Sequence, residues 1–288
     1  MRHRWLFVPC LLLWTACQAP APAAVPMSAV DASWRRGEPE PPRVIAVDPT
    51  VGALLRAAFA AHAAQRRVLL QNLANVATPA YKRQRVALGT QGVEGPGGEQ
   101  SLLPVVLGVE PDLDAGVLEH TGRALDVAVD GAGWLAVQVA DGTMAFTRVG
   151  NLQISPDGRL VTGCGCKVLP EITVPSDLLE LSIDPQGRLS GRTAGNPDGC
   201  TLFGELTLHR FVNPAGLRLD HDGLRHVTEA SGQPLTGTPG SQGLGLLKQG
   251  FLERSNVDSA AALLELQVLE RQHQTLVEVL RQFGMVAP

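Results

Sequence analysis

Apolar residues along the chain change their spacing twice, and these changes divide the sequence into elements. Over residues 51–76 they recur at helical spacing, after an Asp48-Pro49 pair that supplies an N-cap carboxylate and a proline at the first helical position. Thr78-Pro79 should end the helix, because proline lacks an N–H and crowds the preceding turn. The pattern predicts a helix over 49–77. The apolar residues near its end are Leu69, Leu73 and Val76.

A second helical pattern closes the chain. Ser255 is a candidate N-cap, with Asp258 in the first turn. The apolar positions then step by three and four, as in the a/d seam of a coiled coil. This seam consists of Leu266, Leu269, Leu276, Leu280 and Phe283, with His273 as a polar position. Neither helix can bury its stripe alone, so we expect the two helices to pair with each other and with neighbouring subunits.

Between the helices the spacing falls to two from Val117 onward. Turn pairs such as Asp141-Gly142 and Asp157-Gly158 punctuate this region, which predicts an antiparallel β domain over about 117–230. The flanking segments lack such periodicity. We interpret 85–116 as an extended, flexible connection and the Gly/Ser-rich segment 231–248 as a linker.

The N-terminus has the pattern of an export signal. Basic residues precede an apolar run over 5–16, which is too short for a typical membrane span and predicts a signal peptide over 1–16. Small residues before Cys17 resemble a lipoprotein processing site, with Cys17 as the lipidated residue. The Pro/Ala-rich segment 17–47 would then be a tether. The alternative is that Met27 is the true start.

Composition narrows the class of protein. The 288 residues carry a net charge of -4 and are 44% hydrophobic, which permits a folded core of one or two units. Aromatic residues make up only 4%, while Gly and Pro are abundant, which suits turn-rich β structure joined to Ala/Leu-rich helices. The mild acidity gives no reason to expect a nucleic-acid partner.

Two stretches carry a family resemblance. Gln71–Thr78 with Tyr81-Lys82-Arg83 resembles the N-terminal signature of flagellar rod and hook proteins, and 249–257 resembles their C-terminal signature. The motif residues are Asn72, Leu73, Asn75, Tyr81, Lys82, Ser255 and Asn256. The family usually has glycine where this chain has Ala80; if that position needs a positive φ, alanine costs about 1 kcal/mol there. From charge alone, Lys82 and its basic neighbours read as an exposed segment.

The central region is similar to the same family, nearest to its distal-rod group, in 125–134, 147–150, 158–162 and 211–217. The resemblance implies a mixed α and β fold. A discontinuous, coiled-coil-like domain of terminal helices (48–84 and 249–284) would hold an inserted, antiparallel all-β domain.

The resemblance also implies a function. We expect a structural component of the bacterial flagellar basal body in the periplasm that self-associates, joins other rod and hook proteins, and transmits torque for motility. The export signal keeps two alternatives open. One is a membrane-tethered paralogue, lipid-anchored at Cys17 to the outer membrane, that caps or seats the rod; the other is a secreted binding or enzymatic lipoprotein.

Candidate chemistry is sparse. Gly131-Ala-Gly133 fits part of a dinucleotide fingerprint, but alternating residues follow it where a helix would have to begin, so we predict a β-turn and no cofactor. Cys200 with Cys164 or Cys166 is a candidate disulfide in an exported chain. Zinc bound by these cysteines and His209 is the less favoured alternative, and we expect no metal. No recognisable catalytic motif occurs, so we expect no enzyme.

Overall fold

The computed structural model describes residues 49–95, 98–220 and 223–282, all within the unit Ala46–Pro288. The first helix, α1 (Pro49–Ala74), ends three residues before the predicted boundary, in a turn closed by Asn75 N donating to Asn72 O. The last helix, α2 (Ser259–Gln282), is preceded by Asp258, whose Oδ1 accepts hydrogen bonds from the backbone N–H groups of Ala260 and Ala261. Asp258 is therefore the N-cap, and the prediction of Ser255 was wrong.

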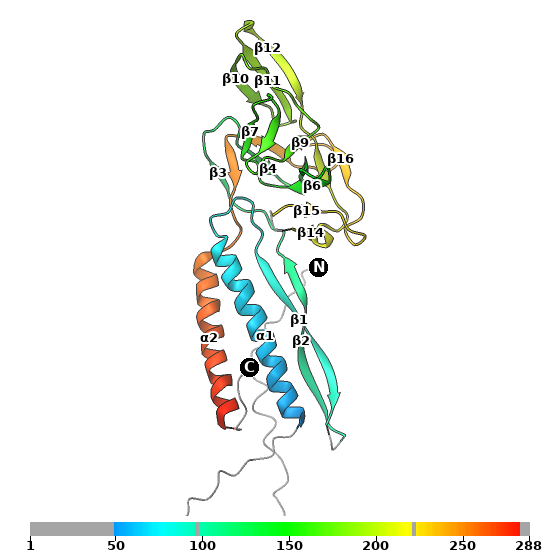
Figure 1. The fold of residues 1–288 in the computed structure, drawn as a ribbon, viewed down its shortest axis with the longest axis vertical. Helices are drawn as coiled ribbons and strands as arrows, with labels where there is room; N and C mark the ends of the chain where they lie inside the picture. The colour runs from blue at the N-terminus through cyan, green and yellow to red at the C-terminus, as the bar shows by residue number, and fades with distance from the viewer. Residues whose placement is uncertain (1–48, 96–97, 221–222, 283–288) are drawn as a thin grey trace, which may run out of the picture. The chain divides into compact units, whose positions relative to one another are not determined.

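The two helices lie side by side and run antiparallel (Figure 1). Leu55 and Phe59 of α1 form a buried cluster with Leu280, near the end of α2. Further along, the ring of Phe59 packs edge-on against His273 at 4.7 Å, and Arg66 Nε lies 3.5 Å from Glu270. Leu55 and Phe59 are four positions apart, and Arg66 lies seven positions, or about two turns, beyond Phe59, so one line of the helix faces α2.

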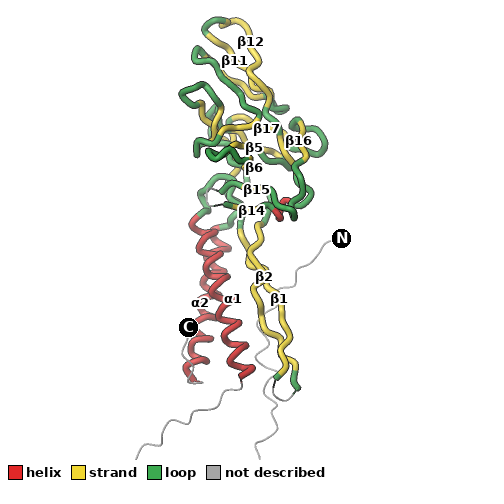
Figure 2. The backbone as a smooth tube through the Cα atoms, turned by 45° about the vertical axis from the view of Figure 1, so that its right-hand side comes forward, coloured by secondary structure: helices red, strands yellow, loops and turns green. Residues whose placement is uncertain are grey.

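The segment predicted to be a flexible connection is an ordered hairpin. Strands β1 (Gln84–Glu94) and β2 (Gln100–Pro111) pair antiparallel, with a register shift between Ala87 and Leu88. The hairpin runs beside α1 in both views (Figures 1 and 2) and contacts it. The prediction failed because β1 shows no regular alternation of buried and exposed side chains.

A second line of α1 is buried on the side away from its α2 contacts. Ala61, Ala64 and Val68 are almost fully covered, and Asn72 continues this line at the end of the helix. The Asn72 side chain bonds the backbone of Gln84 at the start of β1. This line therefore faces the hairpin, and small alanines let helix and strands approach closely.

The rest of the chain between the helices is built from short strands, and every strand pair is antiparallel. The largest sheet has seven strands in the order β14-β15-β6-β5-β9-β8-β7. Its members are β5 (Leu135–Gln138), β6 (Met144–Thr147), β7 (Leu152–Ile154), β8 (Leu160–Thr162), β9 (Lys167–Leu169), β14 (Arg218–Leu219) and β15 (Arg225–His226). A short 3-10 helix, Pro214–Gly216, precedes β14.

Smaller sheets complete this region. A three-stranded sheet joins β10 (Leu178–Ile183), β11 (Arg188–Thr193) and β12 (Asn196–Glu205). Three strand pairs remain: β3 (Leu118–His120) with β18 (Phe251–Glu253), β4 (Val127–Asp130) with β17 (Leu246–Gln249), and β13 (Leu208–Arg210) with β16 (Leu235–Gly237). The main core between the sheets includes Val127, Leu135, Leu152, Leu189, Leu206 and Leu208, each with no exposed surface.

Several predicted turns are confirmed. Asp141-Gly142 connects β5 to β6, and Asp157-Gly158 connects β7 to β8. Gly131 and Gly133 lie between β4 and β5 with φ of 116° and 140°, so this glycine-rich stretch joins two strands and opens no helix.

The linker predicted at 231–248 was wrong. It contains β16 and most of β17, and both strands pair with strands far away in sequence. Ser231 has no exposed surface, and Leu244 and Leu247 belong to the main core. Glycine, serine and proline here serve tight turns inside the β region. Across the described ranges, neither helix is both long and apolar enough to cross a membrane.

Candidate functional site

A buried ionic cluster joins the segment after α1, the segment before α2 and the seven-stranded sheet. Glu253 Oε1 lies 2.6 Å from Lys82 Nζ, and its Oε2 lies 2.6 Å from Arg148 Nε. The side chains are 2% (Lys82), 7% (Arg148) and 0% (Glu253) exposed. One carboxylate thus holds two cations from different parts of the chain.

Further hydrogen bonds satisfy the polar atoms of this cluster. Lys82 Nζ also donates to Asp114 O at 2.8 Å, and Gly116 N donates to Glu253 Oε1 at 2.9 Å. The Arg148 guanidinium donates to the carbonyl oxygens of Val129, Gly131 and Gly133 at 2.8–2.9 Å. Such a fully bonded network rigidifies the segments that it joins.

Electrostatics keep Glu253 ionised in this setting. Burial alone would raise the pKa of Glu253, but the positive charges of Arg148 and Lys82 hold it below its ordinary value. Burial lowers the pKa of Lys82, and Glu253 opposes that shift. Because each charge depends on its partners, removing one member would leave a charge buried without compensation.

A second group of bonds brings the two signature stretches together. The Asn72 side-chain oxygen accepts hydrogen bonds from Gln84 N (2.8 Å) and Tyr81 Oη (3.2 Å). The Asn256 side-chain oxygen accepts one from Arg83 N at 2.6 Å, and its amide donates to the carbonyls of Asp112 and Asp114 at 2.9 Å. The two asparagine side chains therefore bond backbone N–H and carbonyl groups at two places, where the chain leaves α1 and just before it enters α2.

Ala80 adopts the backbone conformation that its position suggested. Its φ is 56°, in the left-handed region, and its N–H donates to Glu253 O at 2.8 Å. The conditional expectation of a positive φ is confirmed. Alanine carries a steric cost there that glycine would avoid.

Comparisons with known proteins agree with this arrangement. The family described as Flagellar hook protein FlgE/F/G D1 domain matches residues 128–191. The Flagellar basal-body rod protein FlgG of Agrobacterium fabrum is 34% identical over 223 residues, covering 72% of this chain and 85% of that protein. The chain belongs to the flagellar basal-body rod protein family.

Other members of the rod protein family show similar identity and coverage. FlgG of Buchnera aphidicola subsp. Acyrthosiphon pisum is 36% identical over 222 residues, covering 72% of this chain and 85% of that protein. The Flagellar basal-body rod protein FlgF of Salmonella typhimurium is 33% identical over 223 residues, covering 75% and 86%. Both are named as flagellar basal-body rod proteins, and no catalytic family is indicated.

The remaining signature residues of this rod-family chain have local roles. The Asn75 side-chain amide donates to Gln71 O at 2.8 Å, and its oxygen accepts from Thr78 Oγ1 at 3.1 Å. Ser255 Oγ accepts from Val257 N at 3.3 Å. Leu73 is half-buried on α1. These contacts shape the ends of the helices.

Lys82 was expected to be exposed, and that expectation was wrong. Sequence reasoning also missed Arg148 and Glu253, although both lie in stretches that carry the family resemblance. The other basic residues of the segment do reach the surface: Arg83 pairs with Glu265 and Arg85 with Asp112, each at 2.7 Å. The pattern of charges does not distinguish the buried lysine from its exposed neighbours, because its carboxylate partner, Glu253, lies far away in the sequence.

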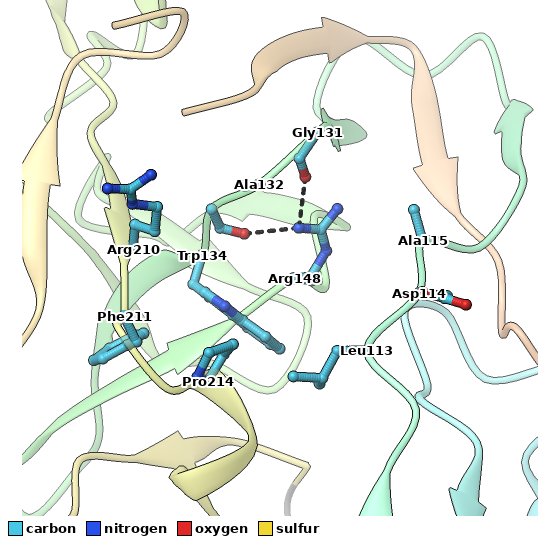
Figure 3. A pocket seen from close by; sticks show the side chains of 11 residues that line it. Leu113, Asp114, Ala115, Gly131, Ala132, Trp134, Arg148, Arg210, Phe211 and Pro214 are labelled. Atoms are coloured by element: carbon cyan, nitrogen blue, oxygen red, sulfur yellow. Dashed lines mark hydrogen bonds between the residues drawn. The ribbon is translucent and has the colours of Figure 1, made fainter. Parts of the chain in front are cut away.

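A cavity of about 300 Å³ adjoins the ionic cluster (Figure 3). The guanidinium of Arg148 lies 5.9 Å from the centre of the Trp134 ring, and that of Arg225 lies 5.1 Å from it. The lining residues are Leu113, Asp114, Ala115, Gly131, Ala132, Gly133, Trp134, Arg148, Arg210, Phe211 and Pro214. This lining offers no serine, cysteine or histidine to act as a nucleophile or base, and Arg148 is already bonded to main-chain carbonyls.

The predicted assembly residues occupy the inner side of the helix pair. Leu269 and Leu280 are buried, and Leu266 and Leu276 are half-buried. On α1, Leu69 is half-buried, as is Val76 just beyond the helix end. Phe283 and Cys17 lie outside the described residues. Within the chain, Leu280 and Leu276 pack in the cluster with Leu55 and Phe59 of α1.

The predicted disulfide to Cys200 is absent. Cys200 forms no disulfide and lies exposed on β12, in the three-stranded sheet. Cys164 and Cys166 lie instead in the turn between β8 and β9 of the seven-stranded sheet, with their sulfur atoms 3.6 Å apart. The predicted partners therefore belong to different sheets.

The alternative zinc set is also separated. His209 is buried between strands, where its Nδ1 lies 2.9 Å from Thr236 Oγ1 and its ring packs on Phe146. Burial lowers the pKa of His209. Within the described part of the chain, no three His, Cys, Asp or Glu residues gather as a possible metal site.

Proposed function

We propose that this chain is a structural unit of the flagellar rod that self-associates, joins other rod and hook proteins, and carries torque along the basal body. The observation behind the proposal is the ionic cluster of Lys82, Glu253 and Arg148. It ties both helix-flanking segments to the β region through one carboxylate. A unit that passes torque needs such a stiff connection between its helices and the part that they carry.

In this proposal the terminal helices form one coiled-coil-like domain, made of 48–84 and 249–284, and the β region is inserted between them. Support comes from the cluster of Leu55, Phe59 and Leu280, which packs the two ends of the chain together. The strands between β3 and β18 enclose a separate core. We infer that helices and β region are distinct parts joined at the ionic cluster.

Self-association would use the outer faces of these parts. Leu264 is 63% exposed and Val268 47% exposed on α2, and their spacing of four places them on one face. On the hairpin, Leu102 and Leu107 are 62% and 71% exposed. Different apolar faces on one subunit favour a head-to-tail contact, which produces a filament when the rotation between subunits does not close into a ring.

The experiment adds charge to the outer face of α2. Leu264→Glu with Val268→Glu should leave the monomer's free energy of unfolding within about 1 kcal/mol, because both side chains are exposed. We expect the same double variant to lose polymerisation and basal-body incorporation, and cells that depend on the protein to stop swimming. The matched control, Gln267→Glu with Gln272→Glu, adds the same charge to exposed positions of the same helix.

Two results would contradict the assembly proposal. One is normal swimming and rod assembly in the Leu264/Val268 double variant. The other is an equal loss in the Gln267/Gln272 control, which would show that charge alone on α2 blocks assembly. An unstable monomer is identified separately by circular dichroism and urea unfolding.

A second candidate function rests on the N-terminal sequence. The basic start, the short apolar run and Cys17 favour a rod-family protein tethered by lipid to the outer membrane, capping or seating the rod. The exported, periplasmic location is part of this proposal. A free binding lipoprotein has less support, because Arg148, which lines the cavity, is engaged in internal bonds to three main-chain carbonyls.

A further inference from the structure

The turn between β8 and β9 presents two thiols that the rod function does not use. Thr162 N donates to Cys166 O, and Gly165 N donates to Thr162 O, each at 2.8 Å. Gly165 has a φ of 86° and open space around it. On the other side, a Cβ added at Gly163 would come within 2.5 Å of Asn151 Nδ2. The turn is therefore closely packed at Gly163 and open at Gly165.

The sulfur atoms lie within this turn at short range. Cys164 Sγ is 3.6 Å from Cys166 Sγ and 3.0 Å from Thr162 Oγ1. The buried Thr162 hydroxyl also accepts a hydrogen bond from Cys166 N at 3.2 Å, so one side chain positions both cysteines. Cys164 is exposed, and Cys166 is half-buried. Cys164 is therefore the more accessible of two neighbouring thiols.

We propose that Cys164-Gly165-Cys166 is a dithiol site that a disulfide-bearing protein or small molecule oxidises to a disulfide within the turn. The Cys164 thiolate attacks one sulfur of the donor disulfide, forming a mixed disulfide and releasing the first donor thiolate. Cys166, after losing its proton, attacks Cys164 Sγ, which forms the Cys164–Cys166 bond and releases the second donor thiolate. Two electrons pass from the protein to the donor, and the two thiol protons end on the donor's sulfur atoms.

The surroundings of Cys164 suit the first step. Partial burial would raise the pKa of its thiol, but hydrogen bonds from Thr162 and from the backbone and thiol of Cys166 lower it overall. The second step needs the sulfur atoms to move from 3.6 Å to a bond length of about 2.05 Å. Rotation about the side-chain bonds supplies this movement, and the open space at Gly165 leaves room for the donor.

Cys200 provides a comparison within the same molecule. It is an exposed thiol on β12, outside the sheet that holds the turn. A donor disulfide should therefore leave Cys200 as a mixed disulfide, whereas the turn should lose its mixed disulfide by closing on itself. Comparing the products at the turn with the product at Cys200 therefore distinguishes a preformed dithiol site from general thiol reactivity.

The test exposes the reduced, full-length protein to a mixture of oxidised and reduced glutathione. After an acid quench and maleimide labelling, tryptic peptides are mapped by mass spectrometry. We expect the single tryptic peptide 160–167, which contains both cysteines, to carry an internal Cys164–Cys166 bond, with neither glutathione nor maleimide attached. Cys166→Ser should instead accumulate glutathione on Cys164. Thr162→Val should slow the first step severalfold, and Thr162→Ser should restore the rate.

Several results would overturn the proposal. Glutathione retained on both Cys164 and Cys166 would show that the second step does not occur. A bond from either residue to Cys200, or a turn that stays reduced while Cys200 is modified, would do the same. Cys200→Ser provides a second folded variant, and its turn disulfide should form at the wild-type rate.

Discussion

Lys82 Nζ lies 2.6 Å from Glu253 Oε1, although 171 residues separate them along the chain. The first follows the N-terminal helix α1 (Pro49–Ala74), and the second precedes the C-terminal helix α2 (Ser259–Gln282). Arg148 reaches the same carboxylate from the end of β6. The contact therefore joins the two signature stretches of the rod protein family and attaches both to the β region.

Glu253→Gln tests how much this contact contributes to the free energy of unfolding. The amide keeps the shape of the side chain but leaves Lys82 and Arg148 without a buried counter-charge. Removing one partner of a buried ion pair costs about 3–5 kcal/mol, and we expect a loss of that size in the free energy of unfolding. Urea unfolding followed by circular dichroism measures it.

The matched control is Glu265→Gln, which removes the partner of Arg83 on the surface of α2. Glu265 is 45% exposed, so its ion pair should contribute less than about 1 kcal/mol. If Glu253→Gln and Glu265→Gln lower the free energy of unfolding equally, the buried cluster stabilises the fold no more than a surface ion pair does.

Ala80→Gly tests the strained turn after α1. Alanine is held there at a φ of 56°, and glycine adopts this conformation without the Cβ clash. We expect the free energy of unfolding to rise by about 0.5–1 kcal/mol, after allowing for the greater flexibility of glycine in the unfolded chain. The thermal midpoint and urea unfolding both report the change.

Ala77→Gly is the control in the same turn, because Ala77 does not have a positive φ. It should be destabilised, by up to about 1 kcal/mol. A loss of stability in Ala80→Gly as well would mean that the left-handed conformation carries no net strain in this chain.

Cys17→Ser tests the lipid tether. A lipidated cysteine needs its thiol for acyl attachment, so the variant should lose both metabolic labelling with a fatty acid and retention in the outer-membrane fraction. Wild-type protein should begin at a modified Cys17 when its N-terminus is analysed by mass spectrometry. A native protein that begins at Met27, or unchanged membrane retention in Cys17→Ser, would refute the tether.

The helices and many turns could be predicted because their signals are local. Proline at position 49 marks the start of α1, the spacing of Leu269, Leu276 and Leu280 marks the buried face of α2, and Asp-Gly pairs mark turns. The positive φ at Ala80 followed from the residue that the family usually carries there. Each of these features depends on neighbours in the sequence.

The ionic cluster and the hairpin could not be predicted in this way. Lys82 is buried only because Glu253 and Arg148 meet it in three dimensions, and Arg148 and Glu253 are themselves 105 residues apart. The hairpin is half-covered by α1, so its strands lack the alternation that identifies a sheet with one buried face. The glycine-rich segment 231–248 looked like a linker because its strands are short and its turns frequent.

The pH dependence of stability provides the last prediction. Burial lowers the pKa of His209, and burial together with the charge of His273 lowers the pKa of His62, both from an ordinary value of 6.5. Below pH 6.5 the unfolded chain therefore binds more protons than the folded chain at these two residues. The free energy of unfolding should fall as the pH drops from 7 to 5. Glu253 contributes separately, below its ordinary pKa of 4.5.

The variants His209→Gln and His62→Gln separate the two contributions. Each variant should make the free energy of unfolding less dependent on pH between 7 and 5, and the double variant should show the smallest dependence. This holds even if a substitution changes the stability at pH 7. Thr236→Val is the control, because it removes the hydroxyl 2.9 Å from His209 Nδ1 but keeps the imidazole in place, so the slope should persist. Urea unfolding at half-unit pH steps measures the slope. A double variant with the wild-type slope would show that other groups cause the acid sensitivity, since neither imidazole would then differ in proton binding between the folded and unfolded chain.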